Sequence, residues 1–395
     1  MGILSLDFLN FFLMDYSQLS LDAHALHHGK LELSVKMPLK TTDDLSIAYT
    51  PGVAEPCRVI AKDPKKSFDL TWRGNTVAVI TDGSAVLGLG NIGPEAAMPV
   101  MEGKCALFKA FGGVDAIPIC LATQEVDALV ETIALLEPSF GGINLEDISA
   151  PRCFEIERRL KERLQIPVFH DDQHGTAIVV LAGLYNALKV VGKNIETVRI
   201  VLSGSGAAGI AISELLFSAG AKNLILCDSK GILSLDRTDL NAEKRSVMER
   251  SAENPKMGTL QDAIKGADIF VGVSRPNLLT AEDIATMNTD AIVFAMANPT
   301  PEIMPDEAKK GGARIIATGR SDFPNQVNNV LVFPGIFKGV LEVRAREITP
   351  HMNLVAAKAL AEMVETPNEE HILPSPLEPG VAQRIAMAIK SAVAQ

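Results

Sequence analysis

The sequence V-R-I-V-L-S-G-S-G-A-A-G at positions 198–209 carries a β-branched apolar run into a glycine-rich loop, and apolar residues at helical spacing follow from 210 to 219. In a strand–loop–helix unit, Gly204 permits a tight turn, Gly206 lets the backbone approach a pyrophosphate, and Gly209 allows close helix packing. The first N–H groups of the helix then face the phosphates. The predicted dinucleotide-binding loop comprises Gly204, Ser205, Gly206, Ala207, Ala208 and Gly209.

An acidic residue, Asp228, follows the next predicted strand, 24 residues after Gly204. A carboxylate there accepts a ribose hydroxyl and favours NAD, because the 2′-phosphate of NADP would meet a negative charge. Lys230 could accommodate that phosphate, so NADP stays open. A second glycine pattern, G-L-G-N-I-G at 88–93, lacks a preceding strand and a following acid, which favours a turn lining a substrate pocket.

Strands alternating with helices predict a doubly wound parallel sheet. The apolar runs that predict its strands are 198–202, 223–227, 269–273, 291–295 and 314–317. The upstream part has apolar runs at 76–81, 116–121 and 141–145 and helical spacing at 129–136 and 154–164. The predicted fold class is therefore α/β, with a mixed α/β substrate domain at 1–168, a Rossmann-type NAD(P)-binding domain at 169–330, and C-terminal helices at 331–395 that pack back on the N-terminal domain.

The composition is that of a soluble enzyme, with 395 residues, 47% apolar and 22% charged. A net charge of −11 argues against general binding to nucleic acid or anionic membranes, although not against an anionic substrate. Five scattered cysteines without a C-x-x-C pair favour a reducing cytoplasm. The apolar residues 1–17 lack a basic start and predict a packing or dimer-contact helix, and hence a homodimer or higher homo-oligomer.

Two acidic pairs follow predicted strands, where α/β proteins place their clefts. Glu146 and Asp147 end the run at 141–145, and Asp171 and Asp172 lie in F-H-D-D-Q-H-G-T at 169–176. The carboxylates of Glu146, Asp147 and Asp172 are hard oxygen ligands, which suit Mg²⁺ or Mn²⁺. The alternative is structural, with Asp172 capping the helix that begins near Gly175.

Histidines flank the second acidic pair, at His170 and His174. Two histidines four residues apart bind zinc when both lie on one helix. Here the first precedes the predicted helix and no cysteine supports a zinc site. We interpret both as supporting or structural residues.

With these residues in place, the chain resembles the malic enzyme family, particularly its short bacterial-type members, from about residue 20 to residue 345. Seven sequence blocks in family order carry the resemblance. They are I-A-Y-T-P-G-V-A-E-P-C at 47–57, T-D-G-S-A-V-L-G-L-G-N-I-G at 81–93, M-E-G-K-C-A-L-F at 101–108, N-L-E-D at 144–147, H-D-D-Q-H-G-T-A at 170–177, A-N-P-T-P-E at 297–302 and N-N-V-L-V-F-P-G at 328–335.

The resemblance implies oxidative decarboxylation of (S)-malate to pyruvate and CO₂ with NAD(P). It implies that Tyr49 is the general acid, that Lys104 is the general base, and that Asp171 lies beside the lysine. It also implies the three metal ligands named above. Substrate contacts are implied for Asn298, which would also meet the cofactor, and for Asn328, with Asn329 as a neighbour.

One position departs from larger family members, which carry an arginine for a substrate carboxylate where this chain has Ala85. Arg58 and Arg320 are candidate replacements. Lys104 must act while neutral, and burial or a nearby divalent cation could lower its pKa. Tyr49 precedes the turn Thr50-Pro51-Gly52 and should project from a loop.

Alternative functions remain open at this stage. A malolactic-type enzyme or an oxaloacetate decarboxylase would use the same metal site. An amino-acid dehydrogenase of similar layout would need no metal, and a non-catalytic nucleotide-binding module would leave the carboxylates unexplained.

Overall fold

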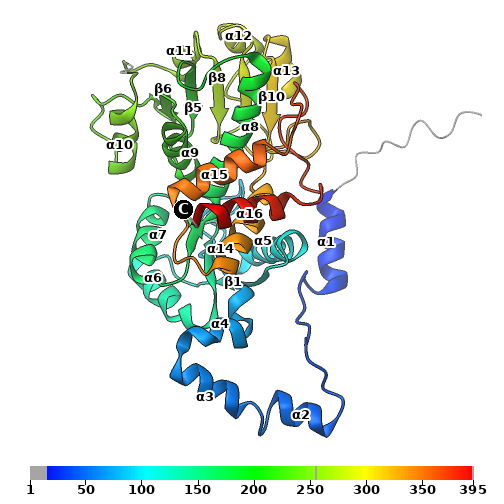
Figure 1. Ribbon diagram of the computed structural model, residues 1–395. Coiled ribbons are helices and arrows are strands. Elements are labelled where there is room, and N and C mark those ends of the chain that lie inside the picture. Colours follow the sequence, from blue (N-terminus) through cyan, green and yellow to red (C-terminus); the bar gives the residue numbers. More distant parts are fainter. Residues whose placement is uncertain (1–15, 254–255, 394–395) are drawn as a thin grey trace, which may run out of the picture.

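The computed structural model describes residues 16–253 and 256–393, so most of the apolar segment predicted at 1–17 lies outside the described residues. The chain forms two sheets with helices on their faces (Figure 1). The larger has the order β10-β9-β8-β5-β6-β7, in which only β7 runs antiparallel. Its strands are β5 Arg199–Ser203, β6 Asn223–Asp228, β7 Gly231–Ile232, β8 Ile269–Gly272, β9 Ile292–Ala295 and β10 Ile315–Thr318.

The smaller sheet has the order β2-β1-β3-β4, and all its strand pairs are parallel. Every residue of β1 is buried, as expected for a central parallel strand covered on both faces. The strands are β1 Thr76–Thr81, β2 Asp115–Cys120, β3 Gly142–Leu145 and β4 Val168–His170. The α/β class predicted from the sequence is thus observed.

Helices surround both sheets. Those of the first sheet are α5 Pro94–Leu107, α6 Val126–Leu135 and α7 Arg152–Arg163, with short turns at Pro64–Lys66, Trp72–Asn75 and Glu137–Ser139. Those of the second are α8 Thr176–Val191, α9 Ala207–Ser218, α10 Ala242–Arg250, α11 Leu260–Ile264, α12 Ala281–Ile284 and α13 Pro305–Lys310. The helix predicted to begin at 210 begins at Ala207, because the last residues of the glycine pattern are already helical.

Two π-helical turns interrupt this pattern, at Phe108–Gly112 and at Asp171–Gly175. The second lies between β4 and α8. Such π-helical turns are rare in proteins, and those that do occur are often at functional sites.

One apolar core runs between the two sheets. It joins β1 and α5 to α8, β5 and the C-terminal helices α14 Phe333–Val343, α15 Pro350–Ala361 and α16 Val381–Val393, which follow a short turn at Asn329–Leu331. Separate clusters fill the outer faces, under α6 and α7 on the first sheet and under α11 to α13 on the second. Asp171–Val191 is long and apolar enough to span a membrane, but 67% of its most apolar window is buried, as in a core helix.

Residues 16–63 form an arm. Its part from 40 to 62 lies apart from the sheets in Figure 1, whereas Lys30 contacts α5 and Lys36 pairs with Asp115 of β2. It carries α1 Tyr16–His27, α2 Thr42–Ala48 and α3 Ala54–Lys62, and α4 Ser67–Leu70 leads back to the body. None of the residues of α1, α2 or α3 is buried. Large apolar side chains on the arm are exposed, including Leu33, Val35, Ile47 and Tyr49. Such a surface on a folded chain marks an interaction site.

Candidate active site

Three carboxylates converge beyond the carboxyl ends of β3 and β4. Ligand atoms of Glu146, Asp147 and Asp172 all lie within 4.8 Å of one another. The strands bring them together because β3 and β4 are parallel neighbours, so the residues that follow each strand meet at one edge. The backbone fixes the arrangement, since the Asp147 N–H donates to Asp172 Oδ2 at 2.8 Å.

Lys104 projects from α5 into the same cluster and is buried. Its Nζ lies 2.6 Å from Asp171 Oδ2 and 2.8 Å from Glu146 Oε1. Phe333 lies beside the ammonium group, with its ring centre 4.4 Å from Nζ. Burial lowers the pKa of Lys104, but the carboxylates of Asp171, Glu146 and Asp172 outweigh burial and raise it above its usual value. Burial alone therefore does not give Lys104 the lowered pKa that was expected, and the effect of a divalent cation on this pKa stays a prediction.

The acidic groups are strained electrostatically in the absence of a cation. Burial and the neighbouring Asp172 carboxylate raise the pKa of Asp147 to about 7. Burial raises the pKa of Asp171 to about 6 against the effect of Lys104. Buried oxygens of Asp147 and Asp171 also lack a hydrogen-bond partner among the described residues. Hard, buried and partly unsatisfied oxygen donors fit a divalent cation such as Mg²⁺ or Mn²⁺.

The π-helical turn that carries Asp171 and Asp172 is tightly packed. A methyl group on Gly175 would lie 1.8 Å from Asp171 Oδ1 and 3.2 Å from Asn329 Cβ. Only glycine leaves room there, so the approach of Asp171 to Lys104 depends on it. Asn329 thus neighbours the site, while the side chain of Asn328 accepts a hydrogen bond from the Val330 N–H and begins the turn that follows.

Asn298 lies in a loop that meets both sheets. A methyl group on Gly88 would lie 2.6 Å from the Asn298 carbonyl oxygen, and one on Gly319 would lie 2.8 Å from its side-chain nitrogen. The G-L-G-N-I-G turn therefore packs against the Asn298 loop. Arg320 lies nearby and donates to the Pro299 carbonyl at 3.1 Å, but it is also paired with Asp322.

Tyr49 and Arg58 are not brought to this cluster. Tyr49 ends α2 on the arm with 72% of its surface exposed, and Arg58 pairs with Glu55 on α3. Among the described residues, no hydrogen bond joins the Tyr49 side chain to Lys104 or to the carboxylates. The tyrosine projects from its turn, as predicted, but it faces solvent.

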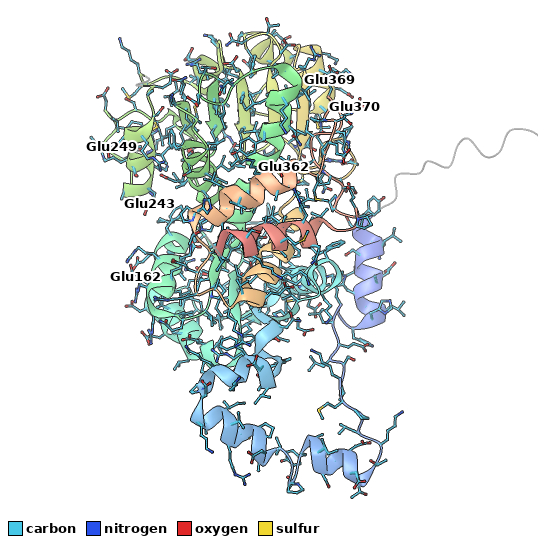
Figure 2. All side chains as sticks on the ribbon, viewed as in Figure 1. Glu162, Glu243, Glu249, Glu362, Glu369 and Glu370 are labelled. Carbon is cyan, nitrogen blue, oxygen red and sulfur yellow. The ribbon has the colours of Figure 1, made fainter. Side chains whose placement is uncertain are left out.

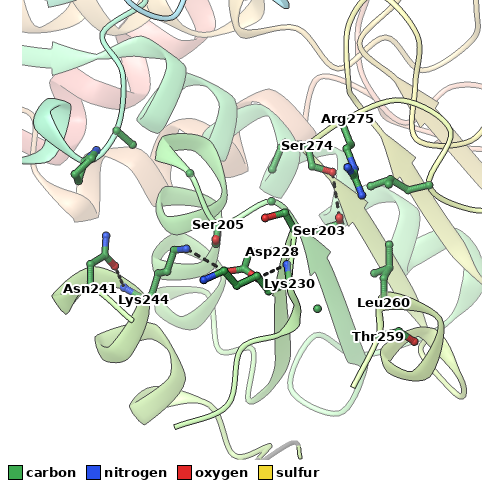
Figure 3. A pocket seen from close by; sticks show the side chains of 18 of the residues that line it. Ser203, Ser205, Asp228, Lys230, Asn241, Lys244, Thr259, Leu260, Ser274 and Arg275 are labelled. Carbon is green, nitrogen blue, oxygen red and sulfur yellow. Dashed lines mark hydrogen bonds and ion pairs between the residues drawn. The ribbon is translucent and has the colours of Figure 1, made fainter. Parts of the chain in front are cut away.

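A cavity of about 910 Å³ opens beside the glycine loop. Figure 3 shows it between three pairs of residues at the carboxyl ends of strands. They are Ser203 and Ser205 at β5, Asp228 and Lys230 at β6, and Ser274 and Arg275 at β8. No side chain caps the N-terminus of α9, so its first N–H groups remain available to phosphate. A methyl group on Gly209 would lie 1.7 Å from the Gly204 carbonyl oxygen, in agreement with its predicted packing role.

Asp228 is more heavily engaged than the sequence suggested. Its Oδ1 accepts hydrogen bonds from the Lys230 N–H and Arg237 Nη1, both at 2.9 Å, and its Oδ2 accepts from Arg237 Nη2 at 2.8 Å and Lys244 Nζ at 3.2 Å. An ionised carboxylate has about four acceptor positions, so all of them are filled. A ribose hydroxyl would have to displace one of these donors.

Sequence reasoning missed several residues that shape the site. Arg152 donates to Asp82, Ser84, Ser149 and the Gln124 carbonyl, and so joins the loops after β1, β2 and β3. Arg237 and Lys244 reach Asp228 from positions 9 and 16 residues later. None lies in a glycine-rich or acidic block, so only the folded chain reveals them.

The raised carboxyl pKa values predict how a cation stabilises the chain. Groups with a pKa raised by folding add stability at low pH, and that stability is lost as pH rises through about 6 to 7. A cation binds the ionised carboxylates, so its stabilising effect should grow over the same interval. We expect saturating MnCl₂ to raise Tm more at about pH 7.5 than at about pH 5.5, measured against EDTA. An equal gain at both pH values would contradict this, and Asp147→Asn should reduce the difference.

Comparison with known proteins places these residues in a family. Residues 173–395 match the family profile "Malic enzyme, NAD binding domain", and 28–125 and 121–161 match "Malic enzyme, N-terminal domain". The chain is 53% identical over 382 residues to the bifunctional malic/malolactic enzyme of Bacillus subtilis, covering 96% of this chain and 93% of that protein. It is 56% identical over 366 residues to the NAD-dependent malic enzyme of Geobacillus stearothermophilus, covering 92% and 76%.

Comparison with solved structures indicates the same family. The crystal structure of the NAD-dependent malic enzyme from Thermotoga maritima superimposes with a TM-score of 0.91 and 49% identity, covering 94% of this chain and 98% of that one. The glycine loop, the clustered carboxylates and the buried lysine thus lie in a chain that matches one family along most of its length. The chain belongs to the malic enzyme family.

Proposed function

We propose that the chain converts (S)-malate to pyruvate and CO₂ with the help of a divalent cation, reducing NAD or NADP. Membership of the family makes it an NAD(P)-dependent malate dehydrogenase of the decarboxylating kind. The observation that supports the metal-assisted chemistry is the position of Lys104, within 3 Å of Asp171 and Glu146 and beside the carboxylate cluster.

The residues that would hold the cation are Glu146, Asp147 and Asp172. A bound Mg²⁺ or Mn²⁺ would polarise the malate hydroxyl and would offset the negative charge around Lys104. Neutral Lys104 would then accept the proton of the malate hydroxyl, and Asp171, at 2.6 Å from its Nζ, lies in position to share that proton.

We propose that Tyr49 protonates the carbon that loses CO₂. To do so, its side chain must reach a carboxylate cluster and the Lys104 beside it. Its exposed position on the arm supports a homodimer in which the arm of one chain lies over the other and supplies the tyrosine there. The apolar arm side chains Leu33, Val35 and Ile47 would be covered at the same time. We also expect a cytoplasmic location, as the cysteine pattern suggests.

We propose that the dinucleotide cavity accepts NADP as well as NAD. Arg237 and Lys244 offset the negative charge of Asp228 that would repel a 2′-phosphate. Lys230 and Arg275 also line the cavity. This weakens the reason for preferring NAD.

A second candidate function is favoured by one relative. The Bacillus subtilis protein is named for both malic and malolactic activity. The same residues would serve a malolactic reaction if the reduced cofactor stayed bound and returned its hydride to pyruvate. Lactate formation without net release of reduced cofactor would support it.

Lys104→Met tests the general base. The methionine retains most of the side-chain volume but accepts no proton, so we expect kcat for malate oxidation to fall by about 100-fold or more. Binding of NADH, followed by fluorescence, should not change, because the glycine loop is untouched. Near-normal malate oxidation by the variant would contradict the assignment.

Paired chains test the shared site. Tyr49→Phe and Lys104→Met chains carrying different tags are co-expressed, and the mixed dimers are purified through both tags. If Tyr49 acts on the other chain, each mixed dimer has one intact site and should show about half the wild-type activity. If each tyrosine serves its own chain, mixed dimers should be as inactive as either parent variant. Dimers in which both chains carry Lys104→Met are the control.

Lys244→Ala tests the cofactor proposal. Loss of a charged hydrogen bond to the 2′-phosphate should lower kcat/KM for NADP by about 10- to 100-fold, while kcat/KM for NAD changes much less. Lys222→Ala is the control, because Lys222 is an exposed residue paired with Glu196 and does not line the cavity. Equal losses for both cofactors would contradict the proposal.

A further inference from the structure

A buried carboxylate near the carboxylate cluster has no part in the proposed reaction. Glu157 lies on α7 and is 6% exposed. Its oxygens accept hydrogen bonds from His174 Nε2 at 2.8 and 3.0 Å and from the His170 N–H at 3.3 Å, and Lys161 Nζ lies 2.8 Å away. A buried carboxylate needs such partners, because an unpaired charge in the interior is strongly destabilising.

Two of these donors belong to the same short turn. His170 immediately precedes the π-helical turn Asp171–Gly175, and His174 is the fourth residue of that turn. Between them lie Asp171, which contacts Lys104, and Asp172, which belongs to the carboxylate cluster. A single side chain from another helix therefore holds the turn on both sides of its two acidic residues.

The geometry limits how far those residues can move. The ring of His174 packs against Phe169, with ring centres 5.4 Å apart, so the imidazole is fixed by packing as well as by Glu157. At the other end, the Thr176 N–H donates to the Asp171 carbonyl and closes the turn. The remaining partner, Lys161, lies on α7 itself and cannot anchor the turn.

We infer that Glu157 is a positioning residue that holds Asp172 at the distance from Glu146 and Asp147 needed to bind a divalent cation. This inference rests on the proposed metal site. Groups that orient metal ligands through hydrogen bonds contribute about 10- to 100-fold to metal affinity in other proteins.

The test is Mn²⁺ binding by the full chain without substrate or dinucleotide, measured by electron paramagnetic resonance. Glu157→Gln retains the shape but loses the charge and one acceptor, so its Kd for Mn²⁺ should rise by about 10- to 100-fold. Its Kd for NADH should stay within about twofold of wild type, because neither Glu157 nor its partners His170, His174 and Lys161 are among the residues that line the dinucleotide cavity.

Two control variants separate positioning from general stability. Glu162→Gln changes an exposed residue of the same helix that pairs with Arg158 (Figure 2), and should leave Mn²⁺ binding unchanged. Lys161→Met removes a partner of Glu157 without touching the turn, and should lower Tm but leave the Kd for Mn²⁺ within about threefold.

Substitutions of His174 test the inference independently. His174→Ala removes one anchor and should weaken Mn²⁺ binding, whereas His174→Gln keeps a side-chain N–H donor and should restore much of it. If Glu157→Gln does not fold, this pair decides the question.

The inference is overturned if folded Glu157→Gln, or His174→Ala in its place, binds Mn²⁺ as wild type does. It is also overturned if Lys161→Met weakens binding as much as Glu157→Gln. Failure of the wild-type chain itself to bind Mn²⁺ would instead refute the metal site, and the inference with it.

Discussion

Four carboxylates and one ammonium group share a buried space at the carboxyl ends of β3 and β4, and the rest of the site depends on that imbalance. Lys104 neutralises part of the charge of Asp171 and Glu146, but Asp147 and Asp172 have no cation of their own among the described residues. Burying uncompensated charge is unfavourable, and burial raises the pKa of Asp147 to about 7 and that of Asp171 to about 6. The same imbalance keeps the lysine charged. We propose that a bound divalent cation would offset this imbalance and so link metal binding to activation of Lys104 as a base.

The fold holds these groups in place with residues outside the cluster. Parallel strands bring the two acidic pairs to one edge, and the turn before α8 admits Asp171 only because Gly175 has no side chain. Arg152 ties together three loops of the first sheet, and Glu157 holds the turn from behind. Positioning thus depends on residues outside the carboxylate cluster. This explains how a site built largely from loops can be precise.

Much of this arrangement could be predicted from the sequence, and the reasons for the remainder are physical. Strands such as β1 and β6 are short apolar runs with clear ends, and the glycine loop has a specific spacing. The acidic pairs follow strands, so their convergence could be expected. The full set of hydrogen bonds to Asp228 could not be predicted. Arg237 and Lys244 reach it from positions 9 and 16 residues later, and only side-chain geometry shows this. The separation of Tyr49 from the carboxylate cluster could not be predicted either, since a sequence motif identifies a residue but not the surface on which it lies.

In the proposed dimer the arm is covered, so its exposure has a consequence for a single chain. None of the residues of α1, α2 or α3 is buried, and the linking backbone between α1 and α2 forms no regular structure. A segment of this kind is open to proteases and to chaperones that recognise apolar side chains. An orphan subunit would therefore be the form most readily cleared by the quality-control machinery of the cell. Assembly would then protect the chain from degradation as well as cover its exposed apolar side chains.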